Sequence, residues 1–285
     1  MRVGRIPYVN CYPVYGAIDR GVVPLDARLV DGVPSALNRL MAAGALDVSV
    51  VSAVEYARQA ERYLLLPDLA ISCDGPVRSV MLFAKRAAEA LDGARVLVSR
   101  SSMTSAALLE LLFEHVWHAR PTFVAGDAEL SDLDRLDAED HDARLVIGDA
   151  ALLLGARAAR SAGRSAAAAP RYSHAYDLGL EWKRWTGLPF VFAVWVAQRT
   201  TAVTDALRVH AGLIASRDWG LAHLGLLAEQ AAAATGVARR ACHQYLSGLD
   251  YRLDYKHLAG LTEFFRRLVM AGRVPNGSLA FLPAA

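Results

Sequence analysis

Polar residues that could bind an anion or move a proton follow short apolar runs at four places in the chain. In open α/β sheets, ligands bind beyond the carboxyl ends of the strands, where the next helices begin. The four segments are therefore expected to meet at one site, and they are Tyr8-Val9-Asn10-Cys11, Ser49 to Ser52, Ser99 to Ser105, and Gly148-Asp149-Ala150. We predict a small anionic ligand next to Asn10, with Tyr8 as a further contact.

The third segment, Ser99 to Ser105, is rich in hydroxyl groups and begins a predicted helix. It holds five serine or threonine residues in seven positions. Backbone N–H groups in the first turn of a helix have no partner within the helix, and the helix dipole favours negative charge there. A simple N-cap by Ser101 or Ser102 needs only one hydroxyl. The excess favours binding of a carboxylate or phosphate, with Ser101, Ser102, Met103 and Thr104 as contacts.

Three other candidate residues keep a structural alternative. Ser52 precedes Glu55 with the spacing of a capping box, so it caps a helix, contacts the ligand, or does both. Asn10 at a strand end either stabilises a turn through its side chain or orients a hydroxyl or carboxylate of the ligand. Asp149 is a candidate general base or the N-cap of the following helix.

Patterns typical of standard catalytic and metal sites are absent from the sequence. It contains no GxSxG, HExxH, P-loop or GxGxxG. His115 and His118 lie on one predicted helix, but no third metal ligand accompanies them. The three cysteines, Cys11, Cys73 and Cys242, form no CxxC or Cys/His pattern, which is typical of a reducing cytoplasm. We therefore predict a cytoplasmic protein with no metal and no cofactor.

Composition and charge argue against several other classes. Much of the hydrophobic fraction of 54% is alanine, and the longest strongly apolar run, Leu188 to Ala197, has ten residues, whereas a membrane-spanning helix needs about 20. The first residues show no secretory signal. A net charge of +2 gives no global attraction to nucleic acid. The acidic run Asp127 to Asp142 is predicted to be a solvated loop, and the oligomeric state is left open.

The hydrophobic periodicity predicts an α/β protein with two lobes, each a doubly wound mixed sheet flanked by helices. The predicted strands are Val3–Val9, Ala27–Val30, Asp47–Val51, Arg95–Ser99, Thr122–Ala125 and Arg144–Ile147, with long crossing strands at Val77–Lys85 and Leu188–Ala197. From Thr200 onward the pattern is helical. This layout resembles type II periplasmic binding proteins, with lobe one at residues 1–84 and 192–285, lobe two at 85–191, and extra C-terminal helices on lobe one.

Longer strings of residues, spread over nearly the whole chain, resemble one family. They are Arg5-Ile6-Pro7-Tyr8-Val9-Asn10-Cys11-Tyr12-Pro13, Leu46-Asp47-Val48-Ser49-Val50-Val51-Ser52-Ala53-Val54-Glu55-Tyr56, Leu66-Pro67-Asp68-Leu69-Ala70-Ile71-Ser72, Gly75-Pro76-Val77-Arg78-Ser79-Val80, Ile147-Gly148-Asp149-Ala150, Tyr176-Asp177-Leu178-Gly179, Trp185-Thr186-Gly187-Leu188-Pro189-Phe190, Tyr245-Leu246-Ser247 and Leu249-Asp250-Tyr251. These strings are similar to the chorismate dehydratase family of the futalosine route to menaquinone.

The resemblance implies a periplasmic-binding-protein-like fold used as an enzyme. The implied reaction is loss of water from chorismate to give 3-[(1-carboxyvinyl)oxy]benzoate, and the family positions that match Asn10 and Ser79 imply a catalytic pair. Chorismate is a dicarboxylate, so the hydroxyl-rich turn and the helix start at Ser52 offer two anion sites, one per lobe. A bound substrate carboxylate could serve as the base, since aromatisation drives the reaction and the protein mainly has to position the substrate.

Two alternative functions are weighed against this prediction. The related dihydroxynaphthoate synthase is expected to use a histidine near the end of a strand in lobe two, where this chain has Gly148-Asp149. A non-catalytic carboxylate-binding protein would need an export signal as a receptor, or an N-terminal helix-turn-helix as a regulator, and neither pattern is seen. We therefore predict an enzyme that closes over a small dicarboxylate and has no nucleic-acid or membrane partner.

Overall fold

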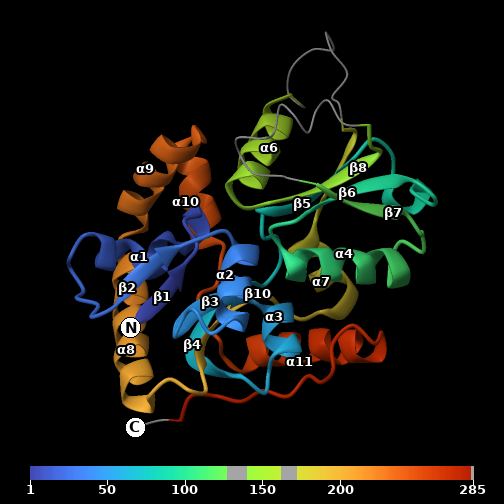
Figure 1. Cartoon of the computed structure of the whole chain (residues 1–285). Helices are drawn as coiled ribbons and strands as arrows, with labels where there is room; N and C mark the ends of the chain where they lie inside the picture. Colours follow the sequence, from blue (N-terminus) through green and yellow to red (C-terminus); the bar gives the residue numbers. More distant parts are fainter. Residues whose placement is uncertain (127–139, 162–171, 284–285) are drawn as a thin grey trace.

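A computed structural model describes residues 1–126, 140–161 and 172–283, and it contains two five-stranded sheets. Figure 1 shows them as separate layers, with the second sheet above and to the right of the first. The first sheet has the order β2-β1-β3-β10-β4, with β1 (Arg2–Arg5), β2 (Arg28–Asp31), β3 (Val48–Ser52), β4 (Tyr63–Cys73) and β10 (Phe190–Gln198). The second has the order β7-β6-β8-β5-β9, with β5 (Val80–Ala84), β6 (Arg95–Ser99), β7 (Thr122–Gly126), β8 (Ala143–Ile147) and β9 (His174–Asp177).

Both sheets are mixed in the same way, as predicted. In the first sheet β1 pairs in parallel with β2 and β3, whereas β10 pairs antiparallel with β3 and β4. In the second, β6 pairs in parallel with β7 and β8, and β5 pairs antiparallel with β8 and β9. Each sheet therefore contains a strand that the chain inserts when it crosses from the other sheet. The carboxyl ends of the parallel strands lead into helices, and those ends carry the predicted site residues.

Helices cover the sheets and form the C-terminal part of the chain. They are η1 (Val9–Cys11), α1 (Tyr12–Asp19), α2 (Pro34–Ala42), α3 (Ala53–Arg58), η2 (Ala88–Ala90), α4 (Met103–His115), α6 (Gly148–Ser161), α7 (Leu178–Thr186), α8 (Val203–Ala222), α9 (Leu224–Thr235), α10 (Arg239–Ser247) and α11 (Tyr255–Met270). Local chemistry explains several starts, since Pro34 occupies the first turn of α2 and Ser52 caps α3. Within the described part of the chain, no helix is long and apolar enough to span a membrane.

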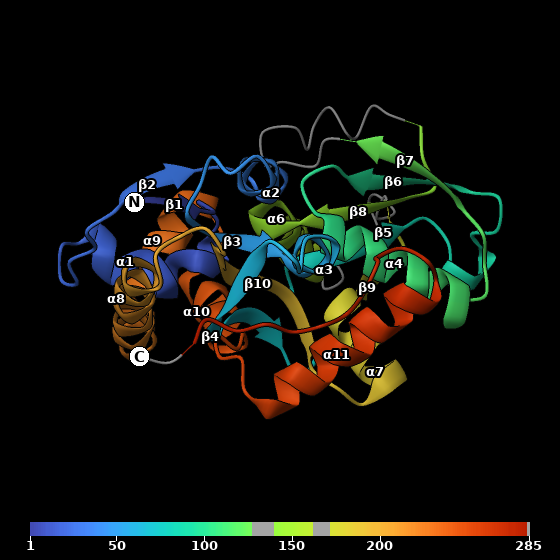
Figure 2. The ribbon, with the colours of Figure 1, turned by 60° about the horizontal axis from the view of Figure 1, so that its bottom comes forward.

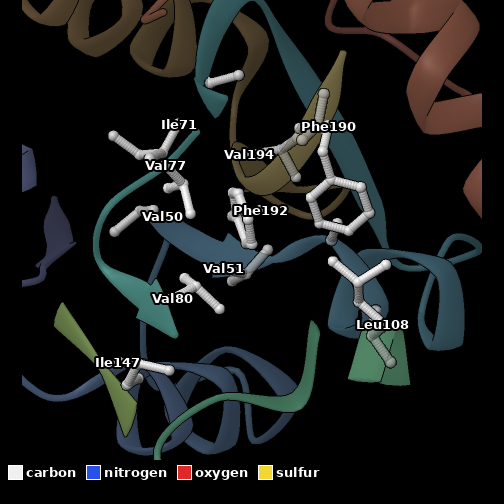
Figure 3. Close-up of a cluster of buried hydrophobic side chains, with 14 of the residues drawn as sticks. Val50, Val51, Ile71, Val77, Val80, Leu108, Ile147, Phe190, Phe192 and Val194 are labelled. Atoms are coloured by element: carbon white, nitrogen blue, oxygen red, sulfur yellow. The ribbon is translucent and has the colours of Figure 1, made fainter. Parts of the chain in front are cut away.

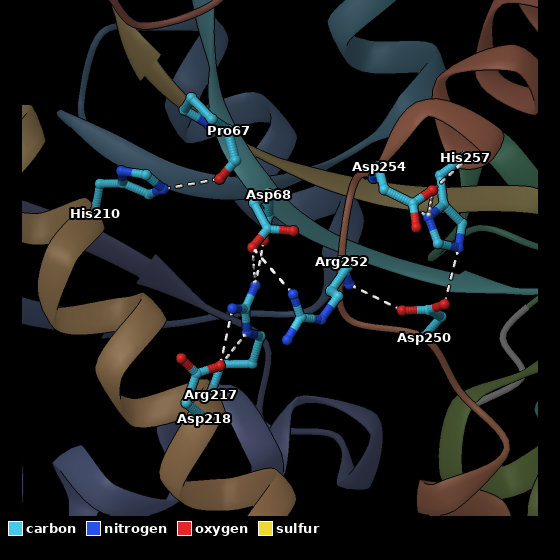
Figure 4. Close-up of polar contacts among 9 residues, drawn as sticks. All are labelled: Pro67, Asp68, His210, Arg217, Asp218, Asp250, Arg252, Asp254 and His257. Atoms are coloured by element: carbon cyan, nitrogen blue, oxygen red, sulfur yellow. Dashed lines mark hydrogen bonds and ion pairs between the residues drawn. The ribbon is translucent and has the colours of Figure 1, made fainter. Parts of the chain in front are cut away.

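The C-terminal helices pack on the first lobe, as predicted. α8 and α9 contact α1, and α11 contacts β10 and α3. Figures 1 and 2 both show α8 beside α1. Figure 4 shows a polar attachment of the same region, where the buried guanidinium of Arg217 on α8 pairs with Asp68 on β4 and with Asp218. The charged group is tolerated inside because two carboxylates offset the cost of removing it from water.

The main hydrophobic core is continuous across both lobes. Figure 3 shows part of it, where Val50 and Phe192 of the first sheet approach Val80 and Ile147 of the second. All four side chains are buried. Burial of one such side chain stabilises the fold by about 1.5 to 3 kcal/mol, so apolar contact holds the two lobes together around the polar residues at the strand ends.

The structure corrects two predicted strands and adds two that were not predicted. The predicted strand Val3–Val9 ends at Arg5, and the predicted strand Val77–Lys85 forms only over Val80–Ala84. In the second case Arg78 adopts a left-handed backbone conformation with φ of 61°, outside the β region, and β5 begins only after it. The sequence reading also gave no strand at β4 or β9. Pro67 and the positive φ of Asp68 interrupt β4, and its place at the sheet edge accommodates both.

The boundaries of the lobes stay a prediction. By strand pairing alone, β5 belongs to the second sheet and β10 to the first. The segments that precede these strands, residues 74–79 and 187–189, are the connections that approach the other sheet. The acidic run predicted as a loop lies almost entirely outside the described residues.

Candidate active site

A cavity lies between the two sheets and is lined by residues of both. Most of its wall is apolar and includes Ile71, Val80, Ile147 and Phe192, which Figure 3 labels. Its polar side chains are those of Tyr8, Asn10, Ser52, Ser79, Ser102 and Ser105. A largely apolar cavity with a few convergent polar groups is typical of a small-molecule site.

Asn10 lies in η1, the short helical turn that follows β1. Its side-chain oxygen is buried and forms no hydrogen bond with any described residue. An unpaired buried acceptor costs about 1 to 3 kcal/mol, and most buried acceptors are satisfied by other protein groups or by water. The side chain also lines the cavity. Asn10 is therefore placed to accept a hydrogen bond from a bound molecule.

Ser79 lies between the two sheets, directly before β5. Its side chain is buried, and its hydroxyl donates a long hydrogen bond of 3.4 Å to the carbonyl oxygen of Val77 and lies beside the Tyr245 hydroxyl. Its own carbonyl accepts a hydrogen bond of 2.8 Å from the N–H of Gly148. Hydrogen bonds therefore fix the backbone of Ser79. Its hydroxyl is held less firmly, and the residue forms part of the cavity wall.

Ser52 and Ser102 cap two helices that begin at the cavity. The Ser52 hydroxyl accepts from the N–H of Glu55, and Ser102 accepts from the N–H of Ser105, both at 3.2 Å. The capping interpretation is therefore correct for both serines, and both also line the cavity. The capped helices are α3 and α4, so two helix N-termini, each with a positive dipole end, approach the same space from different lobes.

Other residues of the predicted anion-binding turn join the lobes together. The hydroxyl of Thr104 accepts a hydrogen bond of 3.2 Å from the N–H of Val54 in α3. The Met103 sulfur accepts one of 3.2 Å from the Asn38 amide of α2. Ser101 is buried beside Ser99, whose hydroxyl accepts from the Ser101 N–H. None of Ser101, Met103 and Thr104 is among the residues that line the cavity, so their contact with substrate stays a prediction.

Asp149 connects the second lobe to the segment that carries Asn10. It lies in the first turn of α6, where the helix dipole favours a carboxylate. Its Oδ1 accepts a hydrogen bond of 3.0 Å from the N–H of Val9, the first residue of η1. Asp149 does not line the cavity, but it lies close behind it. The pKa of the Cys11 thiol is raised mainly by burial and further by the negative charge of Asp149.

Gly148 makes the close approach of the two lobes possible. It has φ of 63°, and a Cβ atom there would lie 3.0 Å from the ring of Tyr8. Only glycine takes this conformation without strain and leaves room for the ring. Tyr8 and Gly148 both line the cavity, so this contact forms part of its wall.

The cavity offers dipoles rather than charges to an anion. Among the described residues that line it there is no lysine, arginine or histidine. Negative charge would therefore be stabilised by hydroxyl groups, the Asn10 amide and the N-terminal ends of α3, α4 and α6. Such groups recognise a carboxylate while leaving the substrate free of a fixed counter-ion.

Several residues around the site were not singled out from the sequence. Ser105 lines the cavity, and Asn38 donates to both Ser52 and Met103. A polar residue between Leu37 and Met41 on the buried face of a helix was a usable signal for Asn38. The buried Tyr245 hydroxyl lies beside the Ser79 hydroxyl. Burial raises its pKa, so this phenol stays protonated.

Comparison with solved structures defines the class of fold. Protein AF1704 from Archaeoglobus fulgidus superposes with a TM-score of 0.75 at 20% identity, covering 96% of this chain and 98% of that one. The alkanesulfonate-binding protein SsuA from Xanthomonas axonopodis pv. citri has a TM-score of 0.67 at 12% identity, covering 98% and 96%. The chain therefore has the two-lobed periplasmic-binding-protein-like fold.

Comparison of sequences shows the family within this fold. The family model described as menaquinone biosynthesis matches residues 1–269. The chorismate dehydratase of Thermus thermophilus is 35% identical over 272 residues, which is 92% of this chain and 95% of that protein. The chorismate dehydratase of Campylobacter jejuni is 27% identical over 197 residues, covering 68% and 66%. The chain belongs to the menaquinone biosynthesis family.

Proposed function

We propose that this protein is a chorismate dehydratase, a hydro-lyase of menaquinone biosynthesis. The observation that carries the proposal is the 35% identity to the Thermus thermophilus chorismate dehydratase, which extends over 92% of the chain. The reaction removes the ring hydroxyl of chorismate and the proton on the neighbouring carbon that bears the enolpyruvyl ether. Water leaves, the ring becomes aromatic, and the product is 3-[(1-carboxyvinyl)oxy]benzoate.

The cavity supports this proposal because its chemistry matches the needs of the reaction. Its apolar wall suits the ring, and its hydroxyls and helix N-termini suit the two carboxylates. In the proposed complex the Asn10 amide and the Ser79 hydroxyl contact the reacting part of the substrate. Exclusion of water by the surrounding apolar side chains would strengthen each of these dipolar contacts.

The substrate itself is the proposed base. Among the described residues that line the cavity there is no carboxylate or histidine. Chorismate carries one carboxylate on its enolpyruvyl ether side chain. The ether oxygen of that side chain is bonded to the ring carbon that loses the proton. That carboxylate can reach the proton once the side chain is held in a folded arrangement, so the protein contributes mainly orientation.

The proposal is tested by incubating the purified protein with chorismate and following the products by mass spectrometry. We expect a product that is lighter than chorismate by one water and has the absorbance of an aromatic ring. If chorismate is retained by the protein but remains unchanged, the protein is a carboxylate-binding module and the enzyme assignment is wrong. Addition of EDTA is expected to leave the rate unchanged, because no metal is part of the proposed site.

The remaining sequence predictions belong to the same proposal. A cytoplasmic location is supported by the three cysteines, all of which are buried free thiols. The absence of a cofactor and of a nucleic-acid partner stays a prediction that the purified protein can test directly.

A further inference from the structure

The connection from the first sheet to the second contains a strained turn next to Ser79. The turn covers residues 74–79, between the end of β4 and the start of β5. Within it, Arg78 has φ of 61°, a left-handed conformation that is unfavourable for a residue with a Cβ atom. Such a conformation persists only where surrounding interactions hold it. Contacts from the start of α7 and from α10 surround this turn.

The Asp177 carboxylate provides that interaction with both of its oxygen atoms. Oδ1 accepts hydrogen bonds from the N–H of Val77 at 3.0 Å and from the N–H of Leu180 at 3.1 Å. Oδ2 accepts a short hydrogen bond of 2.6 Å from the N–H of Arg78. The carboxylate therefore caps α7 and, with the same side chain, binds two successive amides of the turn. Asp177 as a residue is only 9% exposed.

Close packing fixes Asp177 relative to the turn. A Cβ atom at Gly179, in the first turn of α7, would lie 2.6 Å from the Cys73 sulfur and 2.8 Å from the carbonyl oxygen of Gly75. The start of α7 therefore rests directly on the chain that enters the turn. On the far side, the Arg78 guanidinium donates to the carbonyl oxygen of Gln244 in α10. The turn is thus held between two helices.

Ser79 depends on this turn because its hydroxyl has little bonding of its own. Its hydroxyl donates a long hydrogen bond to the carbonyl of Val77, and Val77 is itself held through its N–H by Asp177. We propose that Asp177 is a positioning residue, which holds the Val77–Ser79 backbone so that the Ser79 hydroxyl is presented to the cavity. This inference rests on the proposed function, in which Ser79 contacts the substrate.

The test compares Asp177→Asn with Asp254→Asn. Asparagine is as good an N-cap as aspartate, so both variants keep their helix caps. In Asp177→Asn, the amide oxygen that keeps the cap takes the place of Oδ1 and still accepts from Val77 and Leu180. The side-chain NH2 group then takes the place of Oδ2, faces the N–H of Arg78 and cannot accept from it. Asp254 caps α11 by accepting from Lys256 and His257, and it serves as a matched control far from the turn. We expect kcat with chorismate to fall at least tenfold in Asp177→Asn, with KM changed less than threefold, and kcat of Asp254→Asn to stay within twofold of the wild type.

Two further variants separate positioning from a general loss of stability. In a Ser79→Ala background, Asp177→Asn should lower kcat no further, because the two changes act on the same contact. In Asp177→Asn, the additional change Arg78→Gly should recover part of kcat, because glycine adopts the left-handed conformation without strain. Equal kcat losses in Asp177→Asn and Asp254→Asn, or full additivity with Ser79→Ala, would overturn the proposal.

Crystal structures of the wild type and Asp177→Asn provide a readout that does not depend on activity. We expect Arg78 to leave the left-handed region in the variant and the Ser79 hydroxyl to move away from the cavity. An unchanged turn in Asp177→Asn contradicts the positioning role. If the wild type itself does not convert chorismate, the proposed function fails, while the two structures still decide whether Asp177 holds the turn.

Discussion

Asn10 and Ser79 contribute their polar atoms to the cavity while making few bonds to the rest of the protein. The Asn10 oxygen has no hydrogen-bond partner among the described residues, and the Ser79 hydroxyl donates a long hydrogen bond to Val77. Free hydrogen-bonding capacity of this kind costs stability in the unliganded protein and is recovered when a ligand binds. At the scale of the single residue, these two positions therefore favour substrate binding over stability.

Replacement of either residue should reduce catalysis much more than stability. We expect Asn10→Ala and Ser79→Ala each to lower kcat roughly 100-fold, a loss typical of a misplaced substrate, because both groups are proposed to orient chorismate. Circular dichroism melting should change little, because neither side chain makes a strong internal bond. Ser216→Ala is a matched control, since Ser216 is a buried serine of α8 whose hydroxyl also has no partner within the described chain. Wild-type rates in both site variants would remove Asn10 and Ser79 from the catalytic assignment.

Asp149 gives a separate test of which group takes the proton. The oxygen of an asparagine can still accept the hydrogen bond that Val9 donates, so Asp149→Asn should leave η1 in place. If the substrate carboxylate is the base, kcat should stay within about tenfold of the wild type, a smaller loss than removal of a general base causes. Steady-state rates and calorimetric binding of chorismate measure this. Intact binding with near-zero turnover would instead identify Asp149 as the base.

At the scale of the element, the site is assembled from helix starts. α3, α4 and α6 each begin at the end of a strand in the two sheets, and their first turns surround the cavity. The caps at Ser52 and Ser102 use one hydroxyl each and leave other N-terminal amides of these helices unpaired within the helix. Cross-lobe bonds then use some of those amides, as Val54 does with Thr104. The N–H groups at these helix starts are therefore the donors both for anion binding and for hydrogen bonds between the lobes.

The start of α6 is the element most sensitive to a single added methyl group. Gly148→Ala forces a side chain into a left-handed conformation and against Tyr8, so we expect the free energy of unfolding to fall by about 1 to 3 kcal/mol and kcat/KM to fall as well. Gly155→Ala in the same helix is the control. A Cβ there meets nothing within 4 Å, so it should be neutral or stabilise by up to about 1 kcal/mol. Equal effects of the two substitutions would exclude the close contact at Tyr8.

At the scale of the whole molecule, a polar cluster around the buried His257 joins the C-terminal region to the first sheet. Figure 4 shows the buried imidazole of His257 between Asp250 and Asp254, at 3.0 Å and 2.9 Å. The backbone of Asp250 also pairs with Ser72 of β4. This cluster fixes the start of α11, which in turn covers β10 and α3. Loss of the cluster should therefore lower the free energy of unfolding.

The cluster predicts how stability depends on acidity. Burial alone would raise the pKa of Asp250, but the His257 imidazole and the N–H of Arg252 lower it below the ordinary 3.8. A lowered pKa means that the folded state favours the carboxylate, so the stabilisation is present above about pH 4 and is lost as the pH falls below it. Asp250→Asn should reduce the free energy of unfolding at pH 7 by about 1 to 3 kcal/mol and flatten the acid limb of the stability curve.

Chemical denaturation between pH 7 and pH 3 measures this effect. Asp205→Asn provides the control, because Asp205 pairs with the exposed Arg208 and such surface pairs contribute little. An acid limb of the same slope in Asp250→Asn and the wild type would show that the cluster has no part in acid unfolding.

The sequence by itself determined what depends on neighbours along the chain. The Ser52–Glu55 spacing, Pro34 and the hydroxyl-rich turn before α4 predicted helix starts that the structure confirms, since each is a local capping interaction. Periodic apolar runs also placed most of the strands. The edge strand β4 was not predicted because Pro67 and Asp68 interrupt its apolar pattern. Strand β9 was not predicted because four residues are too few to show a pattern.

Only the tertiary structure decided which of these elements act together. Asp177 binds Val77 across 100 residues of sequence, and Asp149 binds Val9 across 140. Nothing local to an aspartate reveals a distant amide, since the bond exists only after two sheets have packed. The same holds for Thr104 and Met103, which the hydroxyl-rich turn suggested as ligand contacts and which the structure places at the contact between lobes. Local spacing fixed where polar groups occur, and the packing of distant segments decided whether each faces a ligand or the protein itself.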